Sequence, residues 1–189
     1  MALKATIFKA QLQIADTDHN CYQDHALTLA RHPSETDERM MVRLLAYALS
    51  VGELNKGEAL TFGKGLSADD EPDLWCRDLT GAIGLWIDVG LPDEKSVRKA
   101  CGRAGQVRIY SYGRGARAWW DQVRSKLDRA ANLTVINLGP DSTQAMAALA
   151  QRNMRLQCTI QDGHLWLSDG NESVRVEPST IKAGQTGLL

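Results

Sequence analysis

Residues 82–112 read AIGLWIDVGLPDEKSVRKACGRAGQVRIYSY, and this stretch decides the fold class. Residues 82–89 form a nearly continuous apolar run, which is typical of a strand that is buried on both faces. Residues 93–104 follow Pro92 with apolar side chains at helical spacing. Residues 106–112 form a second strand-like run. A strand, a helix and a strand in this order predict two parallel strands joined by a crossover helix.

The same alternation continues toward the C-terminus. The pattern predicts a helix over 115–130, a strand over 133–138 and a helix over 141–151. The region from 82 to 151 is therefore expected to form a parallel α/β unit.

Both chain ends are expected to form β-hairpins instead. The predicted strands cover residues 3–16, 22–31, 154–161, 164–168 and 173–177. Asp162-Gly163 between two of them is a strong hairpin signal. The tail 178–189 is expected to be frayed.

The clearest helix of the chain is predicted over residues 35–53. A capping-box spacing begins at Ser34, and apolar residues recur at helical intervals from Met41 onward. Glu38 lies on or beside this apolar face, whereas Arg39 and Arg43 lie elsewhere on the helix. A short strand over 58–63, a loop over 64–73 and one or two helical turns near 71–75 are expected to follow.

Composition describes a soluble globular protein. The chain has 189 residues, of which 43% are hydrophobic and 24% charged, which fits one domain. No apolar run approaches the roughly 20 residues of a membrane helix, and the first residues alternate rather than form a signal peptide. Four widely spaced cysteines are typical of free thiols in a reducing compartment. We therefore expect a cytoplasmic protein.

The charges are unevenly distributed along the chain. Residues 69–94 hold eight acids and one base, whereas residues 95–129 hold ten bases and two acids. Two interpretations remain open. The two blocks can neutralise each other on one surface, or an acidic pocket that holds a cation can lie beside a basic surface that attracts phosphates.

Three acidic side chains are candidate metal ligands. Glu38 lies on the long helix, Asp73 follows a proline, and Asp88 interrupts a buried strand, where a carboxylate is costly unless it is paired or metal-bound. Carboxylate oxygens suit Mg²⁺, which activates water for attack on a phosphate. As alternatives, Glu38 compensates the helix dipole, Asp73 is a solvated acid at a helix start, and Asp88 pairs with Arg108 or Arg98.

Residues 113–118, GRGARA, form a glycine-rich turn before a helix. The letters match a dinucleotide fingerprint weakly, because no acid stands at the end of the next strand to bind a ribose. Arg114 and Arg117 are nevertheless placed to contact a phosphate. On the same helix, Trp120 is expected in the core and Trp119 at a more exposed position.

Several longer stretches of the chain resemble the YaeQ family. They are MALKATIFKA, LTLARHPSET, ERMM, RLLA, ADDEPDLW, LWIDVGLPDEKSVRKAC and TIQDGHLWLSD. The resemblance implies an α/β fold that varies the PD-(D/E)XK nuclease core, with a mixed sheet, flanking helices and an added β-rich hairpin region. It further implies one domain over 1–189. The nuclease-like core spans about 34–151, and the β-rich addition comes from about 1–33 and 152–178.

The resemblance also implies a catalytic site that binds Mg²⁺ or Mn²⁺. Asp73 matches the aspartate of the PD element, Asp88 the following acid, and Glu38 the helix acid, with Asp73 and Asp88 as the metal ligands. Gly90 stands where the family pattern has a lysine. Lys99 on the next helix is the candidate replacement, although it points away from that helix's apolar stripe.

Two functions are therefore expected from this resemblance. The first is Mg²⁺-dependent hydrolysis of nucleic-acid phosphodiesters, in which Arg114 and Arg117 contact phosphates. The alternative is a non-catalytic protein of the same fold that binds nucleic acid or a protein partner. A membrane partner is not expected.

Overall fold

The structure, a computed structural model, describes residues 4–55, 57–64 and 71–185. The strands are β1 (Thr6–Asp16), β2 (Cys21–Arg31), β3 (Leu60–Phe62), β4 (Leu74–Arg77), β5 (Ile83–Val89), β6 (Ala104–Tyr112), β7 (Leu133–Leu138), β8 (Asn153–Gln161), β9 (His164–Ser168), β10 (Ser173–Val176) and β11 (Ser179–Lys182). The helices are α1 (Asp37–Val51), α2 (Glu94–Cys101), α3 (Ala116–Leu127) and α4 (Pro140–Ala147). Most of the predicted loop 64–73 lies outside the described residues.

These elements build two mixed sheets. The six-stranded sheet has the order β11-β7-β6-β5-β4-β3, and its strands β5, β6 and β7 run parallel, which confirms the prediction from the strand–helix alternation. The five-stranded sheet has the order β10-β9-β8-β1-β2 and joins the two ends of the chain. The predicted hairpins β1–β2 and β8–β9 both form.

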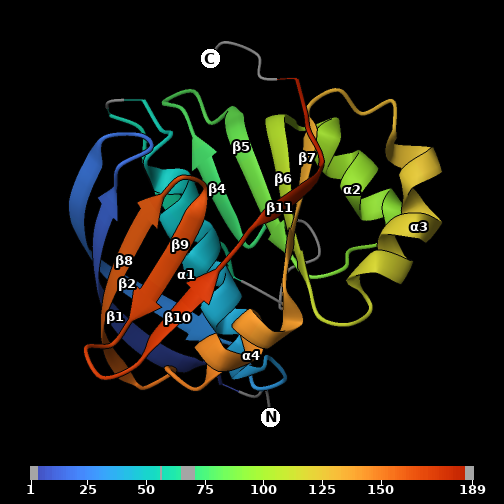
Figure 1. Ribbon diagram of the computed structural model, residues 1–189. Coiled ribbons are helices and arrows are strands. Elements are labelled where there is room, and N and C mark those ends of the chain that lie inside the picture. The colour runs from blue at the N-terminus through green and yellow to red at the C-terminus, as the bar shows by residue number, and fades with distance from the viewer. Residues whose placement is uncertain (1–3, 56, 65–70, 186–189) are drawn as a thin grey trace.

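Helix α1 lies between the two sheets, as Figure 1 shows. Its apolar side chains pack against inward-facing residues of β1 and β8 on one side and of β4 and β5 on the other, in one buried cluster. Helices α2 and α3 cover the opposite face of the six-stranded sheet, where Trp86, Val97 and Val123 belong to a second cluster. The molecule is therefore layered as sheet, helix, sheet and helices.

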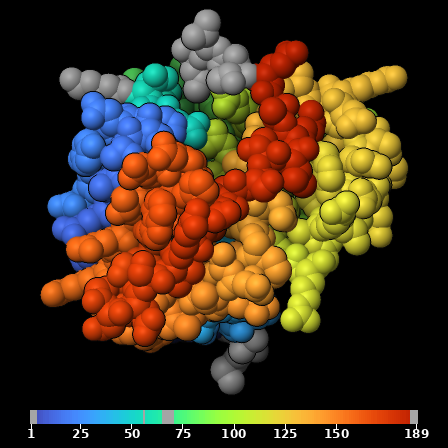
Figure 2. Space-filling view, in the orientation of Figure 1, coloured from blue at the N-terminus to red at the C-terminus, as the bar shows by residue number. Residues whose placement is uncertain are grey.

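Two expectations about secondary structure were wrong. Residues 74–77 form β4 rather than a helical turn, because Trp75 pairs with Trp86 across the sheet. The tail is not frayed throughout, because β11 pairs antiparallel with the end of β7. In Figure 2 the C-terminal segment (red) is visible at the surface between the β8–β10 region (orange) and the yellow elements.

Two local predictions also need correction. Thr36, not Ser34, caps α1, and its hydroxyl accepts a hydrogen bond from the Arg39 N–H at 3.1 Å. Trp119 is only 9% exposed, because its indole donates to the Pro92 carbonyl at 2.8 Å, whereas Trp120 is half-buried. Among the residues that the structure describes, no helix has the length and apolar character needed to cross a membrane.

Candidate functional site

A pocket of about 600 Å³ opens where β5 ends. Its wall is built from the first half of α1, the residue before β4, the end of β5, the loop that follows β5, and α2. Asp73, Asp88 and Lys99, three of the four predicted catalytic residues, all line it. The carboxyl ends of parallel strands are a common place for ligand sites in α/β proteins, because chain crossings leave a crevice there.

Asp88 enters this pocket from β5 and is half-buried. The Trp86 indole N–H donates to its Oδ2 at 2.9 Å. Burial raises the pKa of Asp88 to about 6, and the nearby negative charge of Asp73 adds to the rise. The two ion-pair partners considered for Asp88 are engaged elsewhere, since Arg108 pairs with Glu53 at 2.8 Å and Arg98 pairs with Glu94 at 3.2 Å.

Asp73 is buried rather than solvated, with 5% of its surface exposed. Its Oδ2 accepts the Val89 N–H at 2.8 Å, so the side chain ties the start of β4 to the end of β5. Arg39 Nη2 donates to both carboxylate oxygens of Asp73, at 2.8 Å each. Asp73 therefore links two strands through its hydrogen bond to Val89, and its carboxylate forms an ion pair with the Arg39 guanidinium.

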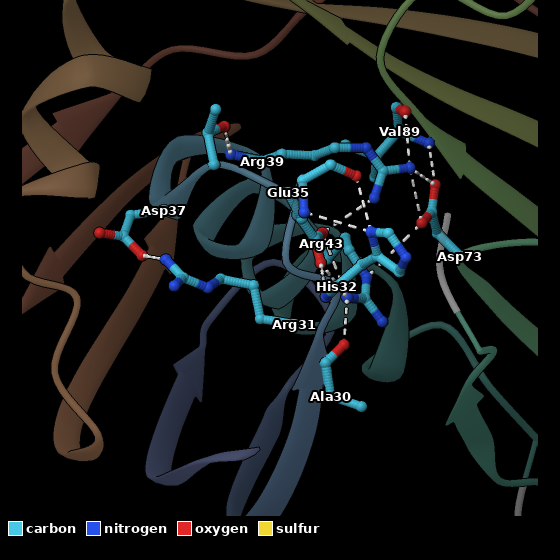
Figure 3. A network of polar contacts seen from close by, with 11 residues as sticks. Ala30, Arg31, His32, Glu35, Asp37, Arg39, Arg43, Asp73 and Val89 are labelled. Carbon is cyan, nitrogen blue, oxygen red and sulfur yellow. Dashed lines mark hydrogen bonds and ion pairs between the residues drawn. The ribbon is translucent and has the colours of Figure 1, made fainter. Parts of the chain in front are cut away.

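Asp73 and three side chains around it form what we call the charge cluster: Glu35, Arg39, Arg43 and Asp73 (Figure 3). Arg39 Nη1 donates to Glu35 Oε1 at 2.9 Å, and Arg43 Nη1 lies 3.2 Å from each Glu35 oxygen. Arg43 Nε lies 3.5 Å from Asp73 Oδ1. Two carboxylates and two guanidiniums thus compensate one another where water is scarce.

The cluster keeps Arg39 charged. Burial alone would lower the pKa of Arg39, but the carboxylates of Asp73 and Glu35 outweigh that effect and raise it overall. The Arg39 side chain is 15% exposed and lines the pocket, whereas Arg43 is fully buried. Arg39 is therefore the member of the cluster that presents its positive charge to the pocket.

Glu38 is not brought into the pocket. Its Oε1 accepts a hydrogen bond from Thr143 Oγ1 of α4 at 2.6 Å, so it joins two helices. Glu38 also lies in the first turn of α1, where a negative charge compensates the helix dipole. Asp73, Asp88 and Lys99 thus line one pocket, whereas Glu38 does not line it.

Lys99 of α2 and Arg103, in the turn after α2, border the pocket. Both side chains are exposed, and the buried residues of α2 are Val97 and Ala100. Lys99 lies off that buried stripe and lines the pocket. The Arg103 guanidinium lies 5.5 Å from the centre of the Trp86 ring, in cation–π geometry.

Arg114 and Arg117 are exposed at the start of α3. This helix has no side-chain cap at Gly115 and no acidic residue in its first turn. Gly115 faces Leu91, and Trp119 donates to the Pro92 carbonyl; both Leu91 and Pro92 line the pocket. The first turn of α3 therefore adjoins the pocket.

The sequence argument missed Glu35, Arg39 and Arg43 as members of the site. A usable signal was present, because residues four apart share a helix face and these three follow one another at that interval. From the sequence, Arg39 and Arg43 were expected to lie off the apolar face of the helix. In fact α1 is buried on nearly all sides, so its polar stripe is also internal.

The side chains around Asp73 do not fit the predicted magnesium site as they stand. A carboxylate offers about four lone-pair positions. Three hydrogen bonds of 2.8 Å already engage Asp73, and two of them come from a positively charged group. A divalent cation on Asp73 would have to displace Arg39, whereas Asp88 accepts its side-chain hydrogen bond from the neutral Trp86 indole.

Comparison with known proteins gives one consistent result. A family model described as "YaeQ protein" matches residues 1–178. The "Uncharacterized protein YaeQ" of Escherichia coli (strain K12) is 49% identical over 177 residues, which cover 93% of this chain and 95% of the relative. The crystal structure of the YaeQ protein from Xanthomonas axonopodis pv. citri matches with a TM-score of 0.88 at 49% identity, covering 95% of this chain and 99% of that one. That from Pseudomonas syringae gives 0.88 at 32% identity, with coverage of 95% and 97%.

Proposed function

The chain belongs to the YaeQ family, and we propose that it binds the phosphodiester backbone of nucleic acid at the pocket and the adjoining turn of α3. We further propose that the six-stranded sheet with α1, α2 and α3 is a variation of the PD-(D/E)XK nuclease core. The observation that carries the binding proposal is the set of exposed basic side chains around the pocket. We call them the basic rim: Lys99 and Arg103, which line the pocket, and Arg114 and Arg117 at the adjoining start of α3.

The start of α3 supports an anionic ligand most directly. The first N–H groups of a helix have no partner within the helix and carry partial positive charge. Here no acidic side chain competes for them in the first turn, and Arg114 and Arg117 add full charges beside them. A phosphate is the ligand that such a helix start favours.

Binding without hydrolysis is the form of the proposal that fits the charge cluster. Metal-assisted cleavage of a phosphodiester needs an ion that lowers the pKa of a bound water. Arg39 holds the carboxylate that would bind such an ion. A guanidinium attracts and orients a phosphate, but it does not produce a hydroxide.

Hydrolysis dependent on Mg²⁺ or Mn²⁺ remains the second candidate. It is favoured by one observation, namely that Asp73, Asp88 and Lys99 line the same pocket. In that case Asp73 and Asp88 would hold the ion after Arg39 has moved, and Lys99 would contact the phosphate. This function remains a prediction, as does a protein partner at the same surface.

A charge-reversal experiment tests the binding proposal. The variant R114E/R117E changes the first turn of α3, and R124E/R129E makes the same charge change at exposed positions near the other end of the helix. Affinity for a fluorescent DNA duplex is measured by anisotropy over a salt series. We expect R114E/R117E to lose at least about tenfold in affinity and to reduce the salt slope by about two, with a smaller loss in the control.

The outcomes separate the alternatives. Equal losses in the two variants would mean that only net charge matters and would contradict binding at the pocket rim. If the wild-type protein binds no nucleic acid at low salt, the proposal is wrong, and the mutual neutralisation of the two charged blocks is the better account.

A further inference from the structure

Arg39 has the surroundings of a bound cation. Its Nη2 lies 2.8 Å from both Asp73 oxygens and 3.4 Å from the Val89 carbonyl oxygen, and its Nη1 lies 2.9 Å from Glu35 Oε1. These oxygens come from three separate segments of the chain. They are carboxylate and carbonyl oxygens, the ligand types that hard divalent cations prefer.

We infer that the Arg39 guanidinium is a built-in cation, standing in this pocket where a metal-dependent centre would hold a divalent ion. The consequence is specific: removing Arg39 should convert the pocket into a divalent-cation site formed by Asp73, Glu35 and the Val89 carbonyl. This goes beyond nucleic-acid binding and does not depend on it.

Charge balance explains why a metal and Arg39 exclude each other. With Arg39 in place, two guanidiniums balance two carboxylates in the cluster. A divalent ion added to that set would place excess positive charge where few water molecules screen it. Without Arg39, Glu35 and Asp73 share Arg43 alone, which leaves a net negative charge and oxygens without a donor.

The fixed position of Arg43 makes the conversion feasible. Arg43 is fully buried, and its Nη1 is also held by the Ala30 carbonyl at 3.3 Å. It reaches Asp73 only at 3.5 Å through Nε. Arg43 therefore supports the cluster from the core side. Asp73 lines the pocket, and removal of the Arg39 side chain would open the space between the pocket and the buried Glu35 carboxylate.

The experiment measures Mn²⁺ binding to purified protein without nucleic acid. Mn²⁺ prefers oxygen ligands, and its free form is quantified by electron paramagnetic resonance. We compare the wild type with R39A, R39Q, R39K and the double variant R39A/D73N. R39K keeps a positive charge, and R39A/D73N removes the carboxylate along with the guanidinium.

We expect R39A and R39Q to bind one Mn²⁺ at least about tenfold more tightly than the wild type. We also expect Mn²⁺ to raise the melting temperatures of these two variants and of no other protein in the series. R39K and R39A/D73N should behave like the wild type. If the wild type binds Mn²⁺ as tightly as R39A, Arg39 does not hold the cation position and the inference is wrong.

Folding of the variants is followed by circular dichroism, so that an unfolded variant is recognised. If R39A and R39Q unfold without metal, the inference requires that Mn²⁺ restore the folded state. Failure of Mn²⁺ to bind or to restore either variant overturns the inference, whatever the outcome of the DNA experiment.

Discussion

Asp88 is the residue whose ionisation the fold opposes most clearly. Its folded pKa is about 6, against an ordinary value of 3.8, mainly because burial disfavours the charged carboxylate. Between these two values the folded chain binds more protons than the unfolded chain. The contribution of Asp88 to stability is therefore greatest below about pH 4 and falls as the pH rises toward 6.

The substitution D88N tests this environment. Asparagine keeps an oxygen that accepts the Trp86 N–H but carries no charge. At pH 7.5 we expect D88N to be more stable than the wild type by about 2 kcal/mol, and the difference to shrink toward zero near pH 4. Urea unfolding at the two pH values measures it. The exposed Asp128→Asn is the control, and a D88N difference that does not change with pH would contradict the assigned pKa.

Only part of the site could be predicted at the residue scale. Asp88 stood out because an acid in an apolar strand demands an explanation, and Lys99 because a migrated lysine was sought on α2. Glu35, Arg39 and Arg43 did not stand out, since charged residues on a helix are usually solvated. Their burial depends on the second sheet that covers α1, which no local pattern reveals.

At the scale of elements, the N-cap residue of α1 differs between the sequence prediction and the structure. The spacing of residues favoured Ser34 as the cap, but the Thr36 hydroxyl accepts the Arg39 N–H. The Ser34 hydroxyl instead lies 2.6 Å from His32 Nδ1. Both hydroxyls satisfy local polar groups, but only the Thr36 hydroxyl accepts a hydrogen bond from the helix backbone.

We therefore expect unequal effects from the two alanine substitutions. T36A should lower the free energy of unfolding by about 1 kcal/mol, because a helix N–H loses its acceptor. S34A should cost less than half of that. Urea denaturation of both variants under the same conditions compares them, and a larger loss in S34A would contradict the cap seen in the structure.

Elements were predictable where the pattern was long and local. The parallel strands β5, β6 and β7 followed from apolar runs separated by helices, and the hairpins from alternation and the Asp162-Gly163 turn. Strands β4 and β11 were missed because each has four residues and is defined by its neighbour. Such short strands owe their conformation to pairing, which tertiary structure decides.

On the scale of the whole molecule, the layered arrangement separates the five-stranded sheet from the proposed binding face. The five-stranded sheet lies on one side of α1, and α2 and α3 lie beyond the six-stranded sheet on the other (Figure 1). The buried charge cluster lies between, where α1 meets the start of β4 and the end of β5. Asp73 is thus both a structural link and one of the acids that line the pocket.

In this arrangement some charges of the two blocks pair with each other and others lie at the pocket. Glu94 pairs with Arg98 at 3.2 Å and with Lys126 at 3.2 Å, so part of the charge is neutralised within the α2–α3 layer. Asp73 and Asp88 lie instead in the pocket, and Arg114 and Arg117 project from its edge. The balance between these two effects decides whether the surface attracts nucleic acid.

The central claim is that this face binds nucleic acid without cleaving it, and one titration tests it most directly. Wild-type protein is added to an end-labelled DNA duplex with Mg²⁺ present, from about 50 to 200 mM salt, and each sample is then run on a denaturing gel. The account predicts binding that weakens steeply with salt and DNA that stays intact. Absence of binding at the lowest salt, or cleavage that disappears in D88N, would contradict it.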